Sequence, residues 1–203
     1  MKIYFASKNE AKLKRMRKIF SKIASGFAIE PVPELIDVEE NGEDVFGNSL
    51  QKVLPYKGKY SVPVIAGDTA VFFEGEDFNP THVKRICLEG KDESKLNQEE
   101  IWKLMNDFYV ALARKHGGKK DFYFEDGWSV LFPDGKIEQI KYRRDYILTD
   151  KLQGEPDIYF PLRSLYIVKA TGKSIYEQSE EDWENEFASQ IGAFRELFKD
   201  KNI

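Results

Sequence analysis

The sequence has almost no cysteine. Cys87 is the only one among 203 residues, which excludes an intramolecular disulfide and predicts a cytoplasmic protein. Histidine is nearly as scarce, and two scattered histidines, His82 and His116, beside a single cysteine make a poor metal cluster. We expect a partly buried thiol and two imidazoles at the surface.

Long hydrophobic runs are also missing. The longest, Val62–Phe73, is shorter than the roughly 20 residues that a membrane helix needs, and Pro63, Gly67 and Asp68 interrupt it. The chain begins Met-Lys-Ile-Tyr-Phe-Ala and continues into a strand pattern, so no signal peptide is expected. The sequence therefore predicts no membrane partner.

There is no excess of basic residues. The net charge of −4 argues against general nucleic-acid binding, and we expect no stable nucleic-acid partner. The charge is nevertheless uneven, because residues 8–22 hold seven Lys or Arg and one acid, whereas residues 34–44 hold six acids and no base. A phosphate-binding element facing a metal-binding element would have this pattern, and so would two ordinary solvated surfaces.

The chain has enough apolar residues for a sizeable core, with 41% hydrophobic and 14% aromatic residues. Its length allows one large domain or two closely packed lobes. No internal repeat or long linker marks independent domains. We therefore predict a single domain, residues 1–203, made of two lobes.

Hydrophobic periodicity predicts strands that alternate with helices, and therefore a mixed α/β fold. The expected strands are Lys2–Ala6, Phe27–Val32, Leu35–Val38, Val62–Phe73, Phe122–Phe132, Lys136–Leu148 and Leu165–Ala170, and the expected helices are Asn9–Ile23, Glu43–Leu54, Asn97–Arg114 and Glu180–Lys199. We expect Val62–Phe73 to be interrupted near Gly67 and Lys91–Asn97 to be a loop. The sequence Pro-Asp-Gly at 133–135 predicts a hairpin turn.

A polar turn follows the first expected strand. Ser7, Asn9 and Lys12 provide a hydroxyl, an amide and an ammonium at the start of the next helix. Unpaired backbone N–H groups and the helix dipole favour an anion at such a start, so the motif is compatible with a phosphate site. Ser and Asn are also ordinary N-caps, and capping alone would explain them.

An acidic loop precedes the second expected helix. Glu40 lies in this loop, and carboxylate oxygens are ligands that Mg²⁺ prefers. Asn48 and Lys52 lie four residues apart and so share one face of the helix. Taken alone, these residues are better explained by a solvated acidic loop and a surface lysine.

Asp68 interrupts the most apolar strand of the sequence, next to Gly67. A carboxylate at the end of a buried strand is costly unless it is paired or bound to a metal. Asp68 is therefore a candidate general base. An aspartate that caps the following turn would look the same.

In order and spacing, these three motifs resemble those of the inosine/xanthosine triphosphate pyrophosphatases. That family has Ala-Thr-x-Asn-x-x-Lys after a strand, then Glu-Thr-Gly-x-Thr-Phe-x-Glu-Asn-Ala-x-x-Lys-Ala, then Ala-Asp-Asp-Ser-Gly-Leu. The matching stretches here are Ala6–Lys12, Glu40–Val53 and Ala66–Val71. The resemblance extends over nearly the whole chain and is specific in its first third. It implies a mixed sheet flanked by helices, in two lobes with a central cleft.

The resemblance also implies an activity: a homodimeric enzyme that uses Mg²⁺ to split a nucleoside triphosphate into monophosphate and pyrophosphate. Ser7, Asn9, Lys12 and Lys52 would hold the triphosphate, with Lys52 also acting in catalysis. Glu40 would bind Mg²⁺, and Asp68 would be a metal ligand or the general base for the attacking water. The further substrate-binding residues that the resemblance implies are Asn48, Thr69, Asp157, Phe160 and Gln190.

The chain departs from the family pattern at both ends of the implied site. Gly47 and Gly67 stand where the family has acids, which predicts weaker or altered metal binding. The family's Gly-x-Gly-[Tyr/Trp]-Asp-Pro-x-Phe loop is reduced to Gly154–Phe160, and its His-Arg pair is Ser189-Gln190 here. Those donors contact the 6-oxo purine in the family, so a different base preference is expected.

Three functions remain compatible with the sequence. The first is a working pyrophosphatase that acts on a different base or on several bases. The second is a nucleotide-binding protein that has lost efficient hydrolysis and acts as a sensor or partner protein. The third is an unrelated α/β protein whose basic helix, Asn9–Ile23, binds RNA or a protein partner.

Overall fold

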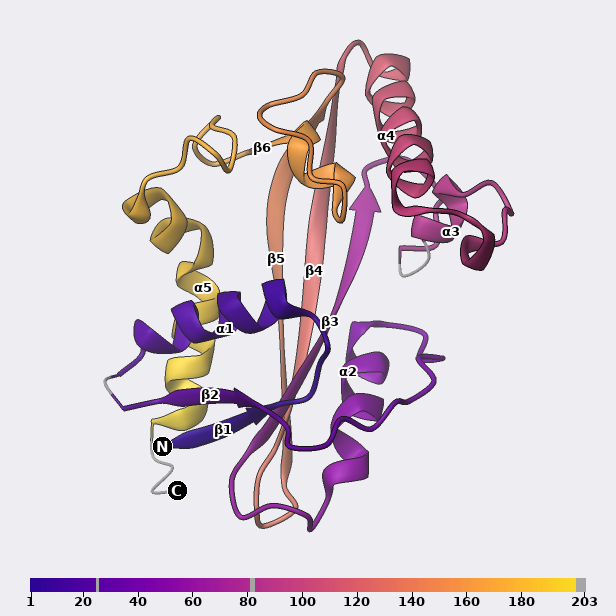
Figure 1. Ribbon diagram of the computed structural model, residues 1–203. Coiled ribbons are helices and arrows are strands. Elements are labelled where there is room, and N and C mark those ends of the chain that lie inside the picture. The colour runs from indigo at the N-terminus through magenta and orange to yellow at the C-terminus, as the bar shows by residue number, and fades with distance from the viewer. Residues whose placement is uncertain (25, 81–82, 200–203) are drawn as a thin grey trace. The chain divides into compact units, whose positions relative to one another are not determined.

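The computed structural model describes residues 1–24, 26–80 and 83–199, and shows a mixed α/β fold (Figure 1). Six strands form one sheet in the order β2-β1-β3-β4-β5-β6. Strand β1 (Lys2–Phe5) pairs in parallel with β2 (Ala28–Pro31) and with β3 (Val64–Phe73). At the other edge, β5 (Ile137–Thr149) pairs antiparallel with β6 (Tyr166–Val168). The prediction of an α/β fold with a mixed sheet is confirmed.

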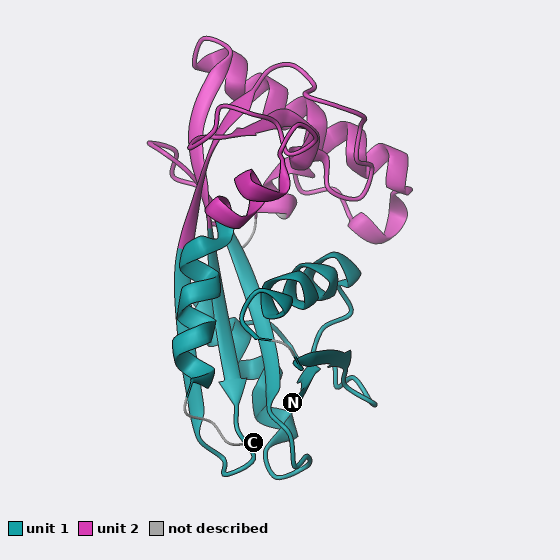
Figure 2. Cartoon of the chain, turned by 90° about the vertical axis from the view of Figure 1, so that its left-hand side faces the viewer, with its two compact units in different colours: residues 1–70, 125–142, 187–203 teal, residues 71–124, 143–186 magenta. Residues whose placement is uncertain are grey.

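The chain divides into two compact units (Figure 2). Unit 1 consists of residues 1–70, 125–142 and 187–203, and unit 2 of residues 71–124 and 143–186. Strands β3, β4 (Lys119–Leu131) and β5 each contribute residues to both units. The organisation of the whole chain as a single domain stays a prediction.

Unit 1 begins with the strand–turn–helix that the sequence predicts. Helix α1 spans Glu10–Ser21, and Asn9 is its N-cap. The residues buried on its inner face recur at helical spacing and are Leu13, Met16, Ile19 and Phe20. The helix ends at Ser21, two residues before the predicted end at Ile23.

Helix α5 (Glu180–Phe198) supplies further apolar side chains to unit 1 through its C-terminal part. Phe20 of α1 packs against Phe194 and Phe198, at ring-centroid distances of 5.1 Å and 5.5 Å. Phe194 also lies edge-on to Trp128 of β4. This aromatic cluster anchors α1, and with it the turn that precedes α1.

Two expectations about the middle of unit 1 are wrong. Residues 35–38 form no strand, although their backbone follows the end of β2. Strand β3 runs without interruption from Val64 to Phe73, because Gly67 and Asp68 both keep an extended backbone. Helix α2 (Val45–Val53) starts two residues later than predicted and continues into a 3₁₀ turn at Leu54–Tyr56, which contains Pro55.

Gly67 lies directly under the ring of Trp128. A Cβ atom at position 67 would lie 2.7 Å from Trp128 Cδ2, far closer than the 3.5–4.0 Å at which carbon atoms normally pack. Trp128 is fully buried and also packs against Phe5 of β1. The indole therefore occupies the space of any side chain at position 67, and only glycine fits there.

Unit 2 has a core of its own, formed largely by aromatic and aliphatic side chains. Helix α4 (Gln98–Lys115) packs its apolar face into this core, and Asn97 and Glu100 form a capping box at its start. A short helix, α3 (Val83–Cys87), was not predicted, and a 3₁₀ turn (Glu93–Lys95) lies within the predicted loop. A second 3₁₀ turn, Pro161–Leu165, precedes β6.

The predicted hairpin is confirmed. Strands β4 and β5 are neighbours in the sheet and join through the turn at residues 132–136. Gly135 adopts a positive φ of 84° there, which glycine permits at little cost. At the open end of the hairpin, β4 begins three residues before the predicted start and β5 ends one residue after the predicted end, whereas at the turn each strand is one residue shorter than predicted.

Cys87 and His116, which lie in the described part of the chain, both have ordinary structural environments. Cys87 is buried in the core of unit 2 rather than partly exposed, and burial raises its pKa to about 12. His116 Nε2 lies 2.6 Å from Glu76 Oε1 at the surface. His82 lies outside the described residues. Among the helices of the described residues, none combines the length and hydrophobicity needed to cross a bilayer.

Two glycine substitutions should have opposite effects on stability. Gly67→Ala places a methyl group into the ring of Trp128, and overpacking of this kind costs about 1–3 kcal/mol. Gly192→Ala is the control, because a Cβ there meets no atom within 4 Å and alanine is the better helix former by roughly 0.5–1 kcal/mol. Urea unfolding should show a lower free energy of unfolding for Gly67→Ala and a higher one for Gly192→Ala, each relative to the unchanged protein. Equal stability of the Gly67 variant and the unchanged protein would contradict this packing.

Candidate active site

A pocket of about 330 Å³ opens in unit 1 beside the end of β1 and the middle of β3. Its lining comes from the turn after β1, the first turn of α1, the loop between β2 and α2, the inner face of α2 and the middle of β3. The lining residues are Ala6, Ser7, Lys8, Asn9, Lys12, Leu35, Ile36, Asp37, Val38, Glu40, Lys52 and Asp68. Six of the residues predicted to surround one anionic ligand are in this list, so the structure brings them together.

The parallel pairing of β1 with β3 explains why these residues meet. Phe5 lies opposite Ile65, and the backbone N–H of Ala6 donates to Ile65 O at 2.9 Å. Because both strands run in the same direction, the turn after β1 comes to lie beside Gly67 and Asp68. The carboxyl edge of parallel strands is where open α/β sheets usually bind ligands.

Ser7 and Asn9 build the turn itself. Ser7 Oγ accepts a hydrogen bond from the backbone N–H of Asn9 at 3.1 Å, and Asn9 Oδ1 accepts one from the backbone N–H of Lys12 at 2.9 Å. Asn9 therefore caps α1 as an ordinary N-cap residue does, and Ser7 stabilises the turn that leads into the cap. These hydrogen bonds fix the first turn of α1, and Lys12 of that turn lines the pocket.

Lys12 and Lys52 converge on one backbone oxygen. Their Nζ atoms lie 3.4 Å and 3.5 Å from the carbonyl oxygen of Gly67. Desolvation, followed by the nearby charge of Lys52, lowers the pKa of Lys12 from 10.5 to about 8. Two ammonium groups held this close in a partly buried site favour an anion between them.

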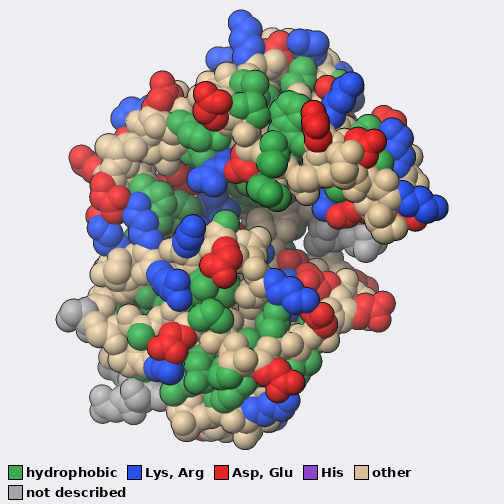
Figure 3. Space-filling model, viewed as in Figure 1, with side chains coloured by type: hydrophobic (Ala, Val, Ile, Leu, Met, Phe, Trp, Pro, Cys, Tyr) green, Lys and Arg blue, Asp and Glu red, His purple; other side chains and the backbone are tan. Residues whose placement is uncertain are grey.

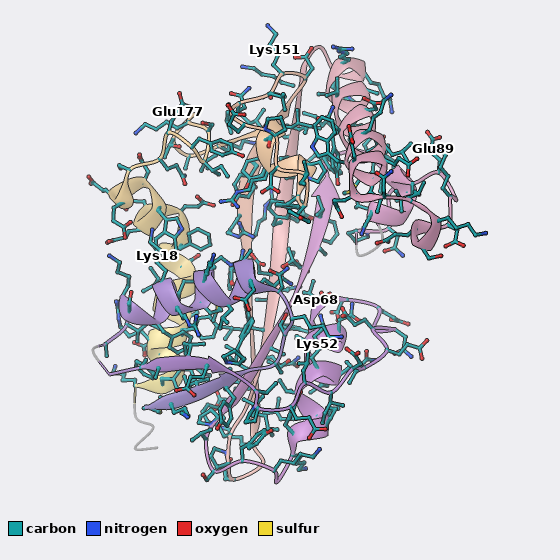
Figure 4. All side chains as sticks on the ribbon, viewed as in Figure 1. Lys18, Lys52, Asp68, Glu89, Lys151 and Glu177 are labelled. Carbon is teal, nitrogen blue, oxygen red and sulfur yellow. The ribbon has the colours of Figure 1, made fainter. Side chains whose placement is uncertain are left out.

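Asp68 is held from two sides by residues of α2. Its Oδ1 lies 3.3 Å from Lys52 Nζ, and its Oδ2 accepts a hydrogen bond from Asn48 Nδ2 at 2.9 Å (Figure 4). Lys52 Nζ also forms a 2.7 Å ion pair with Glu40. One ammonium thus lies between two carboxylates, and Asn48 fixes the orientation of one of them.

Asn48 also positions the loop that carries Glu40. Its Oδ1 accepts a hydrogen bond from the backbone N–H of Gly42 at 2.8 Å, and the side chain is buried. A Cβ at position 42 would lie 2.7 Å from the same oxygen, so the close approach needs glycine. The predicted substrate-binding residue Asn48 therefore links Asp68 to the acidic loop.

Lysines and carboxylates balance one another in the pocket. Lys8 forms an ion pair with Asp37 at 2.7 Å, so the lining holds three lysines and three carboxylates. For Lys12, the described residues provide no carboxylate within ion-pair distance, and its ammonium contacts the Gly67 oxygen. The charges of the lining residues therefore sum to zero, whereas a polyphosphate carries several negative charges.

The donor set fits Mg²⁺ rather than zinc. Two carboxylates, Glu40 and Asp68, already converge on the cation Lys52 Nζ. Magnesium is usually bound by one or two carboxylates together with water and phosphate oxygens. The described residues contain no group of three or more His, Cys, Asp or Glu that could form an all-protein cage.

One polar group of the site region was not predicted. Asp126 of β4 is fully buried, accepts a 2.7 Å hydrogen bond from Thr69 Oγ1 and pairs with Arg15 at 3.0 Å. Thr69, a predicted substrate-binding residue, follows Asp68 in β3, and this hydrogen bond directs its hydroxyl to Asp126 rather than into the pocket. An acid within the apolar run of β4 was the same signal that singled out Asp68.

The three remaining predicted residues do not line this pocket. Gln190 lies in α5 within unit 1, where it is fully buried and its Nε2 lies 3.7 Å from the sulfur of Met16. Asp157 and Phe160 belong to unit 2. Asp157 Oδ1 accepts hydrogen bonds from the backbone of Tyr159 and Phe160, so it shapes its own loop. Their roles toward a base stay predictions.

The basic run at residues 8–22 is partly structural. Arg15 pairs with the buried Asp126, and Arg17 Nε donates to Ile29 O at 2.9 Å. On the face that Figure 3 shows, basic side chains are interspersed with acidic ones. These contacts account for several of the cations without an RNA partner.

Comparison with known proteins identifies relatives. The sequence model of the Ham1 family matches residues 3–126, more than half of the chain. A curated dITP/XTP pyrophosphatase from Aquifex aeolicus is 27% identical over 104 residues, which cover 49% of this chain and 50% of that protein. The aligned part thus spans about half the length of that relative.

Solved structures share the fold at low sequence identity. The Ham1 protein of Staphylococcus aureus superposes with a TM-score of 0.65 at 19% identity, over 98% of both chains. A HAM1 protein from Coxiella burnetii reaches 0.69 at 14% identity, over 99% of this chain and 100% of that one. A nucleoside-triphosphatase, dITP/XTP pyrophosphatase, from Mycobacterium abscessus reaches 0.62 at 17% identity, over 97% and 98%.

Because burial lowers the pKa of Lys12, the stability of the protein should depend on pH. The folded-state pKa of Lys12, about 8, lies below the ordinary 10.5, so the unfolded chain binds more protons between these two pH values. Protein stability should therefore rise with pH over that interval, relative to a Lys12→Met variant. Urea unfolding of both proteins at pH 7, 9 and 10.5 should show the variant to be the more stable at pH 7 and the difference to shrink as pH rises. A difference that does not change with pH would contradict a desolvated ammonium.

Proposed function

Because the chain belongs to the Ham1 family, we propose that it is a nucleoside triphosphate pyrophosphatase. It would hydrolyse a nucleoside triphosphate to the monophosphate and pyrophosphate, with Mg²⁺. The observation that supports this most directly is the convergence of Lys12, Lys52 and Asp68 in one pocket. A curated relative carries the name dITP/XTP pyrophosphatase, which points to the same class of reaction.

The triphosphate would enter where the two ammonium groups meet. Lys12 and Lys52 would exchange the Gly67 carbonyl oxygen for phosphate oxygens, which bear a full negative charge. The first backbone N–H groups of α1 would add dipoles of the same sign. Binding an anion would also raise the pKa of Lys12 and keep it charged.

Glu40 and Asp68 would hold Mg²⁺ once Lys52 moves from them to the phosphates. When bound, the ion neutralises phosphate charge and lowers the pKa of a coordinated water. The charge of the lining gives a physical reason for a metal ion, since the three lysines only offset the three carboxylates and leave the phosphate charge unbalanced.

Asp68 would orient the attacking water and accept its proton. Release of its Oδ1 from Lys52 frees a lone pair, while the hydrogen bond from Asn48 keeps the carboxylate in place. The water would attack the α-phosphorus in line with the leaving pyrophosphate. Lys12 and Lys52 would stabilise the charge that develops on the leaving group.

The identity of the base depends on residues other than those that line the pocket. Asp157, Phe160 and Gln190 are the positions that the family resemblance links to the base. Asp157 and Phe160 keep the residues of the family pattern, whereas the neighbouring Pro156 and Gln190 itself depart from it. Gln190 is a neutral amide in place of a cation, so recognition of a 6-oxo group would lose a charged donor. We propose a base preference that differs from inosine and xanthosine, or a broad one.

A second candidate function has an observation in its favour. Position 67, an acid in the family pattern, is a glycine whose side-chain space is filled by Trp128. One fewer carboxylate near the metal would reduce hydrolysis more than nucleotide binding. A nucleotide-binding sensor or partner protein would have such a site.

We further propose that the protein acts in the cytoplasm as a homodimer. The single, buried Cys87 is compatible with a reducing compartment. The dimer rests on the family resemblance, and sedimentation of the purified protein would test it.

A panel of purine and pyrimidine triphosphates, including the inosine and xanthosine forms, would test the proposed function. With Mg²⁺, equal amounts of monophosphate and pyrophosphate should appear for at least one member of the panel. Nucleotide binding without turnover would favour the sensor. Release of orthophosphate and a nucleoside diphosphate instead would show that the β–γ bond is cleaved, which is a different reaction.

Asp68→Asn should lower turnover by at least about 100-fold, the usual minimum effect of removing a general base, and leave the fold intact. The change removes the proton acceptor and a Mg²⁺ ligand but keeps the shape of the side chain. Asp107→Asn is the control, because it makes the same change at an exposed position of α4 that does not line the pocket. Undiminished turnover in a correctly folded Asp68 variant would contradict the assigned role.

A further inference from the structure

The pocket contains an ion pair that the proposed reaction does not use. Lys8 Nζ lies 2.7 Å and 2.8 Å from the two oxygens of Asp37, and both residues line the pocket. Lys8 belongs to the turn between β1 and α1, whereas Asp37 belongs to the loop between β2 and α2. The pair therefore connects two different walls of the same pocket.

This pair is exposed, in contrast to the inner group. The side chains of Lys8 and Asp37 are 70% and 83% exposed, whereas those of Lys52 and Asp68 are 15% and 13% exposed. An exposed pair contributes little to stability, because water competes for both charges. It can therefore separate at small cost when a stronger anion arrives.

A polyphosphate is such an anion. Its oxygens give the ammonium of Lys8 charge-assisted hydrogen bonds, as the carboxylate of Asp37 does, and it brings several charges rather than one. Lys12 and Lys52 share one contact, the Gly67 oxygen, and so would meet the same part of the ligand. Lys8 shares no contact with them and would reach a different part.

We propose that Lys8 is a further phosphate-binding residue of this pocket, which Asp37 holds in place until a polyphosphate displaces it. The inference rests on the proposed function, because it assumes a polyphosphate ligand at Lys12 and Lys52. It goes beyond that function by assigning a length preference. A longer polyphosphate contacts both the inner lysines and Lys8, whereas a shorter one is held by the inner lysines alone.

Calorimetric binding of tripolyphosphate and of pyrophosphate, both with Mg²⁺, tests this directly. Lys8→Gln should weaken tripolyphosphate binding about fivefold, as the loss of one exposed charge-assisted contact would, and pyrophosphate binding less than about twofold. Lys14→Gln is the matched control, since it removes the same charge from an exposed position of α1 outside the pocket. The control should change either affinity by less than about twofold.

Asp37→Asn provides the reciprocal test. It releases Lys8 and should strengthen tripolyphosphate binding about threefold, an effect that should disappear when Lys8 is also Gln. Glu34→Gln removes the same charge from the same loop outside the pocket and controls for net charge. Coupling between the two substitutions would support the inference.

Two results would overturn the inference alone: equal weakening by Lys8→Gln and Lys14→Gln, or an Asp37→Asn effect that is the same with and without Lys8. If the unchanged protein bound neither polyphosphate, the proposed function would fail and this inference with it. The same calorimetric titrations distinguish two outcomes: polyphosphate binding with no coupling between the Lys8 and Asp37 substitutions, and no polyphosphate binding at all. The failure of the inference alone can therefore be distinguished from the failure of the proposed function.

Discussion

Two lysines that share one carbonyl oxygen impose the main constraint on this protein. Lys12 and Lys52 come from different helices, and their like charges oppose the approach of both to Gly67. The structure offsets this repulsion with carboxylates, since Asp68 and Glu40 both contact Lys52. Lys12 lacks such a contact among the described residues and has a lowered pKa as a result of its surroundings. A ligand with several negative charges would relieve this repulsion, and this is the physical basis of the proposed polyphosphate site.

The same carbonyl belongs to the residue that packing controls most strictly. Gly67 has no room for a side chain because Trp128 covers it, and Trp128 in turn packs between Phe5 and Phe194. The pocket and the core of unit 1 therefore meet at one backbone position. A change made to improve the site there would disturb the core first. This also explains physically why the acid of the family pattern cannot be accommodated at position 67.

The sequence predicts local features of the fold well and long-range contacts poorly. The turn after β1 and the start of α4 follow from capping residues a few positions away, so Asn9 and Asn97 could be recognised without a structure. The continuity of β3 through Gly67 could not, because glycine weakens a strand pattern and only the distant Trp128 explains its presence. Asp126 carries a local signal, an acid within a strand, but its pairing could not be predicted. Its partners, Arg15 and Thr69, lie 111 and 57 residues away in the sequence.

In the candidate site, too, some features were predictable from the sequence and others were not. Proximity of Lys12, Lys52 and Asp68 was predicted from three motifs in order, and parallel pairing of β1 with β3 realises it. The departures from the family pattern have different structural environments. Gly67 is enforced by packing, and Gln190 is buried beside Met16, whereas the pocket keeps the lysines of the family pattern. In the proposed function, phosphate chemistry and base recognition depend on different residues, so the second can change while the first persists. Divergence of this chain is therefore expected to affect the choice of base more than the type of bond that is cleaved.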